Sequence, residues 1–483
     1  MNLKAKTFSG VKWTTASTIL VTIIQLLQLS ILARLLAPSD FGLMAIVMVV
    51  IGFSQAFMDM GVSNAIIHKQ AITQDQLSTL YWLNVLTGIV VFIVICALSP
   101  LMTIFYKEAE LTRLTILVGL TFLIQPFGQQ FLVLWQKEMR FVEMAKIDVV
   151  TKFLSLVVSV GFARAGYGVY SLVYGTLSAV ILQTALLFIL GVKEHRPRMI
   201  FRRGEIDEFI SFGLYQMGER TVNYFGSQID VILIGKLLGT EALGVYNVAK
   251  QLSMRPAQII NPIITKVTFP AMAKVQNDTV TLKRVYLKTI NYLSSVNFLI
   301  YSIMIVLAPN LVFVMFGDKW ILAVPIVQIL SIYGALRSTG NPIGSLLLAK
   351  GKANLGFYWN LGLLLYIPTV IAIASKWGIL GISWMLVFLS ASLIIPSWFF
   401  LVKPLCGATF YEYHKPIITA TLIAMLTIAI GHMLHNWFLS DFLTIGVELF
   451  ALTTITGLCN YIWNREFGIE LYNMIRPNQR EQY

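Results

Sequence analysis

The sequence has very few charged residues and almost no cysteine. Only 12% of its 483 residues are Asp, Glu, Lys or Arg, whereas 57% are hydrophobic, and the mean hydropathy is +0.75. This balance excludes a soluble globular protein and indicates a polytopic helical membrane protein. The three cysteines, Cys96, Cys406 and Cys459, are scattered in or near apolar stretches. They therefore form neither a disulfide framework nor a zinc-binding spacing.

Motifs for nucleotide hydrolysis and metal binding are also missing. No G-x-x-x-x-G-K-[ST] loop occurs, which excludes ATP hydrolysis by a P-loop. His432 and His435 are three residues apart without a third ligand, so we expect no metal site and no cofactor. No loop exceeds roughly twenty residues. A membrane-embedded polymerase or glycosyltransferase, which needs a sizeable loop with catalytic groups, is therefore the least favoured function.

Apolar stretches of roughly 20 residues predict fourteen membrane-spanning helices. They start near Gly10, Phe41, Leu77, Thr112, Met144, Gly168, Ile206, Ala242, Thr289, Leu322, Asn354, Ile379, Pro416 and Asp441. We divide the chain into an N-terminal lobe of six spans (1–192), a linker (193–205), a C-terminal lobe of six spans (206–403), and two last spans with a tail (404–483). The first span is long and lacks a small-residue cleavage site, so we expect it to be retained.

The net charge of +13 follows from membrane topology and does not require nucleic acid. The number of basic residues alternates from loop to loop between the two sides of the membrane. The loops on one side contain only Arg34, Lys107, Arg113, Arg164, Lys236, Lys319 and Lys376. The positive-inside rule therefore predicts that both chain ends lie in the cytoplasm. The longest hydrophilic connection, from Lys193 to Glu208 with Arg196, Arg198, Arg202 and Arg203, is expected to lie on anionic headgroups.

The two halves of the chain repeat each other in pattern. At a constant offset of 202 residues, the matched pairs are Ser9 with Ser211, Arg34 with Lys236, Gly42 with Gly244, and Asp59 with Asn261. At an offset of 216, Gln125 and Pro126 match Asn341 and Pro342. Repeats with polar faces are how secondary transporters build a site near the membrane midplane. We therefore predict two pseudo-symmetric lobes around a central cavity.

Polar stripes mark the first and seventh spans as cavity-lining helices. Gln25 and Gln28 lie on one face of the first span, and Arg220, Asn223 and Asp230 lie on one face of the seventh. Groups of this kind facing lipid would lack polar partners.

Six basic residues fall inside predicted spans, namely Lys152, Arg220, Lys250, Arg255, Lys266 and Arg337. A charge at bilayer depth costs at least ~2.5 kcal/mol, so it usually faces a cavity or a partner. Lys152 can simply pair with Asp148 one turn away, and Lys266 can reach the interface from a span end. The remaining cations suit an anionic substrate, particularly a phosphate or pyrophosphate. Asp59, Asp148 and Asp230 are candidate ion-coupling carboxylates, with structural ion pairs or helix caps as the alternative.

Five ordered sequence blocks resemble a known family. They are ILARLLAPSDFG (31–42), TLYWLN (79–84), NPIIT (261–265), FGDKW (316–320) and RSTGNPIGSLL (337–347). They are similar to the polysaccharide transporter branch of the multidrug/oligosaccharidyl-lipid/polysaccharide superfamily, and most of all to colanic-acid-type Wzx exporters. The likeness extends from about Ser9 to about Lys403.

The resemblance implies a monomeric two-lobed flippase of the bacterial inner membrane, without enzymatic activity, that moves an undecaprenyl-pyrophosphate-linked oligosaccharide to the periplasmic leaflet. In related lipid II flippases a cavity arginine follows a tyrosine-containing turn, and the matching position after Tyr246 is Lys250. This departure keeps the charge but loses the bidentate fork, which Arg255 can supply instead. Other assembly proteins of the polysaccharide pathway and membrane lipids are the further partners that we expect.

The candidate substrate-binding residues are Gln25, Gln28, Arg34, Arg220, Asn223, Lys250, Arg255, Arg337 and Asn341. A cation-coupled multidrug antiporter of the same superfamily is the alternative function. It would favour acidic cavity residues that attract cationic drugs, whereas basic residues here are at least as numerous at depth. Neighbouring genes for glycosyltransferases would favour the flippase.

Overall fold

The computed structural model describes residues 3–58, 66, 72–201, 207–435, 442–464 and 467. Over these residues every regular element is a helix and no strand occurs. The all-α fold class predicted from composition is therefore confirmed. The chain divides into two compact units, Met1–Gly244 and Val245–Tyr483. The predicted lobes and linker stay a prediction.

The helices of the first unit are α1 (Leu3–Leu35), α2 (Pro38–Met58), α4 (Gln74–Tyr106), α5 (Leu111–Gly119), α6 (Thr121–Ile124), α7 (Pro126–Lys137), α8 (Phe141–Arg164), α9 (Tyr170–Gly191) and the first part of α10 (Asp207–Lys274). Helix α10 is interrupted at Gly239, whose φ of 86° and ψ of 176° are not helical. A side chain would strain this backbone, so glycine suits the break. It lies where the sequence predicts the loop between the seventh and eighth spans.

The helices of the second unit are the rest of α10, α11 (Thr279–Phe316), α12 (Ala323–Ala349), α13 (Ala353–Ala374), α14 (Gly378–Ser392), α15 (Ile394–Ser397), α16 (Lys403–Cys406), α17 (Phe410–His435) and α18 (Phe442–Trp463). Three single turns, η2 (Asp318–Trp320), η3 (Ser375–Trp377) and η4 (Trp398–Val402), connect them.

Seven helical stretches in the described part of the chain are long and apolar enough to cross a membrane. An eighth candidate is the pair Leu111–Ile124 and Pro126–Lys137, which is bent by 52° where Pro126 interrupts the helical hydrogen bonds. The protein is therefore a multi-pass membrane protein. The count of fourteen spans stays a prediction.

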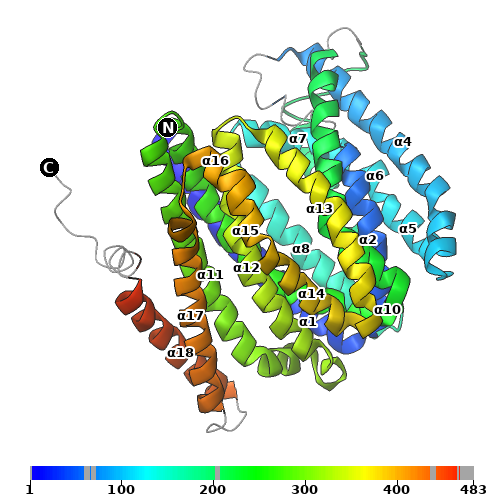
Figure 1. Ribbon diagram of the computed structural model, residues 1–483. Helices are drawn as coiled ribbons and strands as arrows, with labels where there is room; N and C mark the ends of the chain where they lie inside the picture. The colour runs from blue at the N-terminus through cyan, green and yellow to red at the C-terminus, as the bar shows by residue number, and fades with distance from the viewer. Residues whose placement is uncertain are drawn as a thin grey trace. The chain divides into compact units, whose positions relative to one another are not determined.

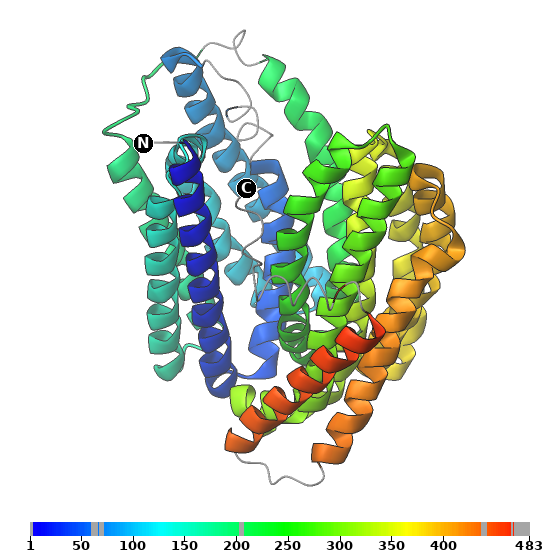
Figure 2. The ribbon, with the colours of Figure 1, turned by 90° about the vertical axis from the view of Figure 1, so that its left-hand side faces the viewer.

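Close helix pairs build the first unit. Helix α1, dark blue in Figure 2, runs alongside α8, and α8 packs against α9. Helix α4 begins with a capping box, in which the Thr73 hydroxyl accepts from the Gln76 amide at 3.2 Å and the Gln76 side chain accepts from the Thr73 amide at 3.3 Å. The start of α4 is therefore well fixed.

Buried polar contacts join the last helices of the second unit to α11. The side-chain amides of Asn291 and Asn464 bond to each other at 3.1 and 2.7 Å, and Asn464 also donates to the Ser295 hydroxyl at 2.7 Å. Helices α17 and α18 lie side by side (Figure 1), and the hydroxyls of Thr427 and Thr456 bond between them at 2.9 Å. Polar contacts of this kind hold helices together in lipid, where hydrophobic burial gives little drive.

Candidate functional site

The polar stripe of α1 contacts α8 inside the first unit. The Gln28 side-chain amide donates to the hydroxyls of Ser155 and Ser159 at 3.3 and 3.0 Å. Gln25, three residues earlier, is half-buried and also has a polar or ring contact, while Arg34 at the end of α1 is exposed. The stripe is therefore held in place within its own unit.

The candidate carboxylates of the first unit differ in their surroundings. Asp148 accepts a hydrogen bond from the Gln183 amide at 3.4 Å, and Lys152 one turn later interacts with it electrostatically. Asp230 is buried at 6% exposure and accepts from the Val231 amide at 2.9 Å. Each carboxylate thus has local partners that fit the structural alternative as well as ion coupling. Asp59 lies outside the described residues.

Two further predicted residues are described only as part of a helix. Arg220 and Asn223 lie in α10, and their side chains fall outside the described part. Their role in substrate binding stays a prediction.

The second unit holds a proline within α10, next to an amide that contacts Tyr301. Pro256 lies inside the helix, where a proline removes one hydrogen bond and presses its ring against the preceding turn. The next amide, that of Ala257, donates to the hydroxyl of Tyr301 on α11 at 3.3 Å. Tyr301 is 1% exposed. Arg255, on the other side of Pro256, is half-buried.

Arg337 on α12 approaches the same tyrosine. Its guanidinium donates to the Tyr333 hydroxyl at 3.0 Å and lies 5.7 Å from the centre of that ring, and it interacts electrostatically with Tyr301. Helix α12 comes close because Gly334 has no side chain there: a Cβ at this position would lie 2.6 Å from the Tyr301 hydroxyl. Asn341, one turn after Arg337, is exposed.

We call Arg255, Tyr301, Tyr333 and Arg337 the cation–tyrosine cluster. Arg337 interacts electrostatically with Tyr301, and Arg255 lies on α10 two residues before the amide that donates to the Tyr301 hydroxyl. Two guanidinium groups and two phenols supply several N–H and O–H donors, which suit the oxygens of a phosphate or pyrophosphate.

Lys250 lies earlier on α10, close to its neighbouring tyrosine. Its ammonium is 5.9 Å from the ring centre of Tyr246, which is fully buried, and the lysine itself is half-buried. Nearby, the Ser253 hydroxyl donates to the Val327 carbonyl of α12 at 3.3 Å. Lys250 is thus a partly buried point charge on the helix that carries Arg255.

Sequence reasoning missed Tyr301 and Tyr333. Aromatic residues make up 12% of the chain, so a tyrosine within a span carries no signal of its own. Pro256 and Gly334 were the available signals, because a helix break needs a polar partner and a small residue permits close approach.

Comparisons with known proteins agree with this architecture. Residues 31–325 match the family model described as "Polysaccharide biosynthesis protein". The chain is 36% identical to the teichuronic acid biosynthesis protein TuaB of Bacillus subtilis (strain 168), over 88% of each chain. It is 32% identical to the lipopolysaccharide biosynthesis protein WzxC of Escherichia coli (strain K12), over 90% of this chain and 88% of the relative.

A solved structure of the lipid II flippase MurJ in an inward closed conformation has the same fold. It superposes with a TM-score of 0.74, covers 94% of this chain and 99% of its own, and is 11% identical. The fold and the level of identity over nearly the whole length give one assignment: the chain belongs to the polysaccharide biosynthesis protein family, in agreement with the resemblance of its sequence blocks to Wzx-type transporters.

Proposed function

We propose that this protein is a flippase that moves an undecaprenyl-pyrophosphate-linked oligosaccharide repeat unit across the bacterial inner membrane by alternating access. The oligosaccharide is destined for exopolysaccharide, O-antigen or capsule. Its relatives are named for teichuronic acid and lipopolysaccharide biosynthesis, and the structure of MurJ, named as a lipid II flippase, shares its fold. The basic residues of its loops support cytoplasmic chain ends.

The cation–tyrosine cluster is the observation that carries this proposal. A sugar–pyrophosphate headgroup cannot cross hydrocarbon unaided, whereas a polyprenol tail can stay in the lipid. The carrier must therefore stabilise the anionic head at membrane depth. Arg255 and Arg337 offer planar guanidinium groups that can bind phosphate oxygens in bidentate fashion. Lys250 adds positive potential on the same helix as Arg255.

The energy for the cycle comes from a source other than a P-loop ATPase, because the sequence has no such motif. We propose three possible sources. They are an ion gradient that acts through Asp148 or Asp230, the membrane potential, and consumption of the product. Protonation of a carboxylate at membrane depth would change its partners and so favour one state of the carrier.

A cation-coupled drug antiporter remains the rival function. Such a carrier attracts cationic drugs with carboxylates, whereas the cation–tyrosine cluster consists of two guanidinium groups and two phenols. We therefore favour an anionic substrate.

Complementation tests the proposal. The gene replaces the flippase of a host that makes a related polymer, and periplasmic exposure of the lipid-linked oligosaccharide is measured together with membrane abundance and drug susceptibility. Arg255→Ala and Arg337→Ala should each abolish export at normal abundance. Arg113→Ala, which removes an exposed arginine from α5, is the matched control and should export normally. Normal export by both cluster variants would refute an anionic site at these positions, and drug resistance without export would favour the antiporter.

A further inference from the structure

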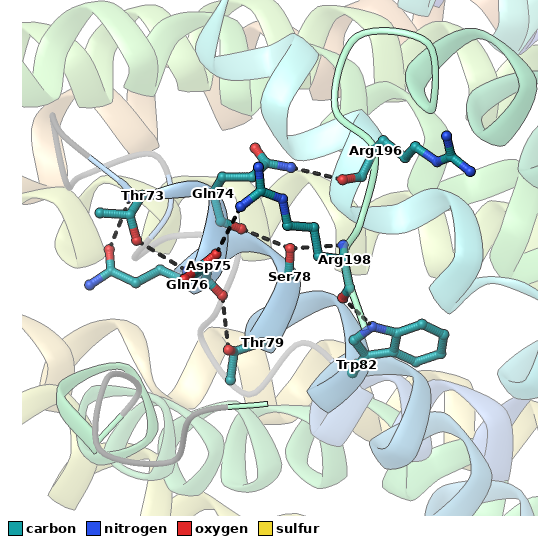
Figure 3. Close-up of polar contacts among 9 residues, drawn as sticks. All are labelled: Thr73, Gln74, Asp75, Gln76, Ser78, Thr79, Trp82, Arg196 and Arg198. Atoms are coloured by element: carbon teal, nitrogen blue, oxygen red, sulfur yellow. Dashed lines mark hydrogen bonds and ion pairs between the residues drawn. The ribbon is translucent and has the colours of Figure 1, made fainter. Parts of the chain in front are cut away.

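The segment 192–201, which follows α9, forms a strap along the start of α4 (Figure 3). Three side chains of α4 hold its backbone: Gln74 donates to the Arg196 carbonyl at 2.8 Å, Trp82 donates to the Arg198 carbonyl at 2.8 Å, and the Ser78 hydroxyl accepts from the Arg198 amide at 3.0 Å. These three contacts use the backbone of the strap and do not occupy its side chains.

The acidic groups beside the strap are paired within the protein. Arg140 bonds to Glu194 at 2.5 Å and lies 3.5 Å from Glu143, while His195 contacts Glu138 at 3.2 Å. Arg140 also lies over the ring of Trp135, 4.5 Å from its centre. These carboxylates are thus engaged by Arg140 and His195, although a single arginine offsets the charge of only one of them.

The basic side chains of the strap are exposed by contrast. Lys193 and Arg196 are exposed, and the Arg198 side chain is 63% exposed although it lies 3.4 Å from Asp75. Two apolar side chains after them are also exposed, Met199 at 86% and Phe201 at 53%. The strap thus presents a mixed basic and apolar surface.

The length of α4 places this surface in the headgroup layer. Its 33 residues extend about 50 Å, whereas the hydrocarbon core is ~30 Å thick, so about 10 Å remains for each interface. The strap contacts α4 from Gln74 to Trp82, a rise of about 12 Å. Tryptophan itself favours the interface. Basic residues at this depth meet lipid phosphates, and Met199 and Phe201 reach the upper acyl chains.

We infer that the strap is a binding element for anionic phospholipid headgroups, which anchors the first unit to one leaflet. The backbone contacts fix the segment that carries Arg196 and Arg198, so the lipid does not have to order a loose loop before it binds. This inference concerns lipids rather than the transported substrate and is independent of the proposed function.

Native mass spectrometry of the purified full chain tests it, with phosphatidylglycerol and phosphatidylcholine as probes. The triple variant Lys193→Gln, Arg196→Gln, Arg198→Gln should bind phosphatidylglycerol roughly a hundredfold more weakly, because each basic residue at an anionic surface is worth about fivefold and the three factors multiply. Phosphatidylcholine binding should not change. The control Arg113→Gln, Arg164→Gln, Lys376→Gln removes the same charge from exposed positions elsewhere and should lose much less.

Two further variants separate ordered binding from bulk charge. Asp75→Asn frees Arg198 and should strengthen phosphatidylglycerol binding severalfold, whereas Trp82→Phe loosens the strap without a charge change and should weaken it. Equal losses in the two triple variants would overturn the inference, since charge alone would then explain binding. Displacement of the lipid by millimolar inorganic pyrophosphate would also overturn it, because the strap would then be a site for a pyrophosphate headgroup.

Discussion

Gly42 and Gly244 meet where α2 crosses α10 in the first unit. A Cβ on Gly42 would lie 1.8 Å from the carbonyl oxygen of Thr240, and a Cβ on Gly244 would lie 1.7 Å from that of Pro38. Thr240 and Pro38 differ by the same 202 positions as the two glycines. The repeat found in the sequence therefore appears here as a symmetric contact, with each glycine against the backbone that precedes the other.

Alanine at either glycine should lower the stability of this helix crossing. Backbone atoms leave no room for the methyl group, so the helices must separate, at a cost of about 1–3 kcal/mol. Thermal stability of the purified protein measures the effect. Gly161→Ala is the control, since nothing lies within 4 Å of a Cβ there, and alanine is a better helix former than glycine. A Gly42→Ala protein as stable as Gly161→Ala would contradict the close contact.

Arg337→Lys should lose most export although it keeps the charge. Lysine cannot reproduce the planar fork that donates to Tyr333 and to phosphate oxygens together. Tyr333→Phe removes only the hydroxyl that accepts from Arg337 and should reduce export by a smaller factor, severalfold at most. Export per unit of membrane protein is the measurement. Equal export from Arg337→Lys and the unchanged protein would mean that charge alone suffices.

Lys250 should behave as a point charge in a wet site. Lys250→Arg is expected to keep most export and Lys250→Gln to lose much of it, because Coulomb attraction depends on charge and not on donor geometry. The opposite result, in which Lys250→Gln combined with Asp230→Asn restores the abundance and export that Lys250→Gln lacks, would assign the lysine a structural role.

Tyr301→Phe should lower the stability of α10 next to Pro256. The half-buried Ala257 amide then loses its hydrogen bond to the Tyr301 hydroxyl, and such a bond contributes about 0.5–1.5 kcal/mol. We expect a lower melting temperature and reduced export. Tyr286→Phe is a suitable control, because that tyrosine is equally buried on α11 and its hydroxyl has no hydrogen-bond partner in the described part of the structure. A larger loss of stability from the control would refute the role of the Tyr301 hydroxyl.

Acid should release the strap from α8. The hydrogen bond from Arg140 is the main cause that holds the pKa of Glu194 below its usual value. A lowered carboxyl pKa stabilises the folded state above the ordinary glutamate value of about 4.3, and the contribution is lost as the pH falls through the lower folded value. Hydrogen exchange of residues 192–201, taken relative to the intrinsic exchange rate at each pH, should therefore rise in that acidic window. In Glu194→Gln, exchange of this segment should be faster already at neutral pH and should change less on acidification.

Composition and periodicity predicted the fold class, because a chain in lipid must satisfy its backbone within helices. The break at Gly239 and the bend at Pro126 also agree with sequence signals, since glycine and proline act locally. Arg255 and Arg337 could be singled out because charges are rare at membrane depth.

The contacts of these residues could not be predicted in the same way. Gln28 was expected to line a cavity, yet its amide donates to hydroxyls of α8 more than a hundred residues away. Tyr301 meets Ala257 only because α11 lies beside α10. Such pairings depend on which helices become neighbours, and a single sequence holds no direct record of that choice. The linker likewise predicted surface charge but gave no sign that α4 would bind its backbone.

The amide pair of Asn291 and Asn464 has a consequence for biogenesis. Until α18 inserts, the nascent chain would expose Asn291 and Ser295 of α11 to acyl chains, where polar groups without partners are costly. The segment around α18 thus supplies polar partners for a helix made about 170 residues earlier. A chain that lacked α18 would therefore leave these polar groups of α11 without the partners seen here.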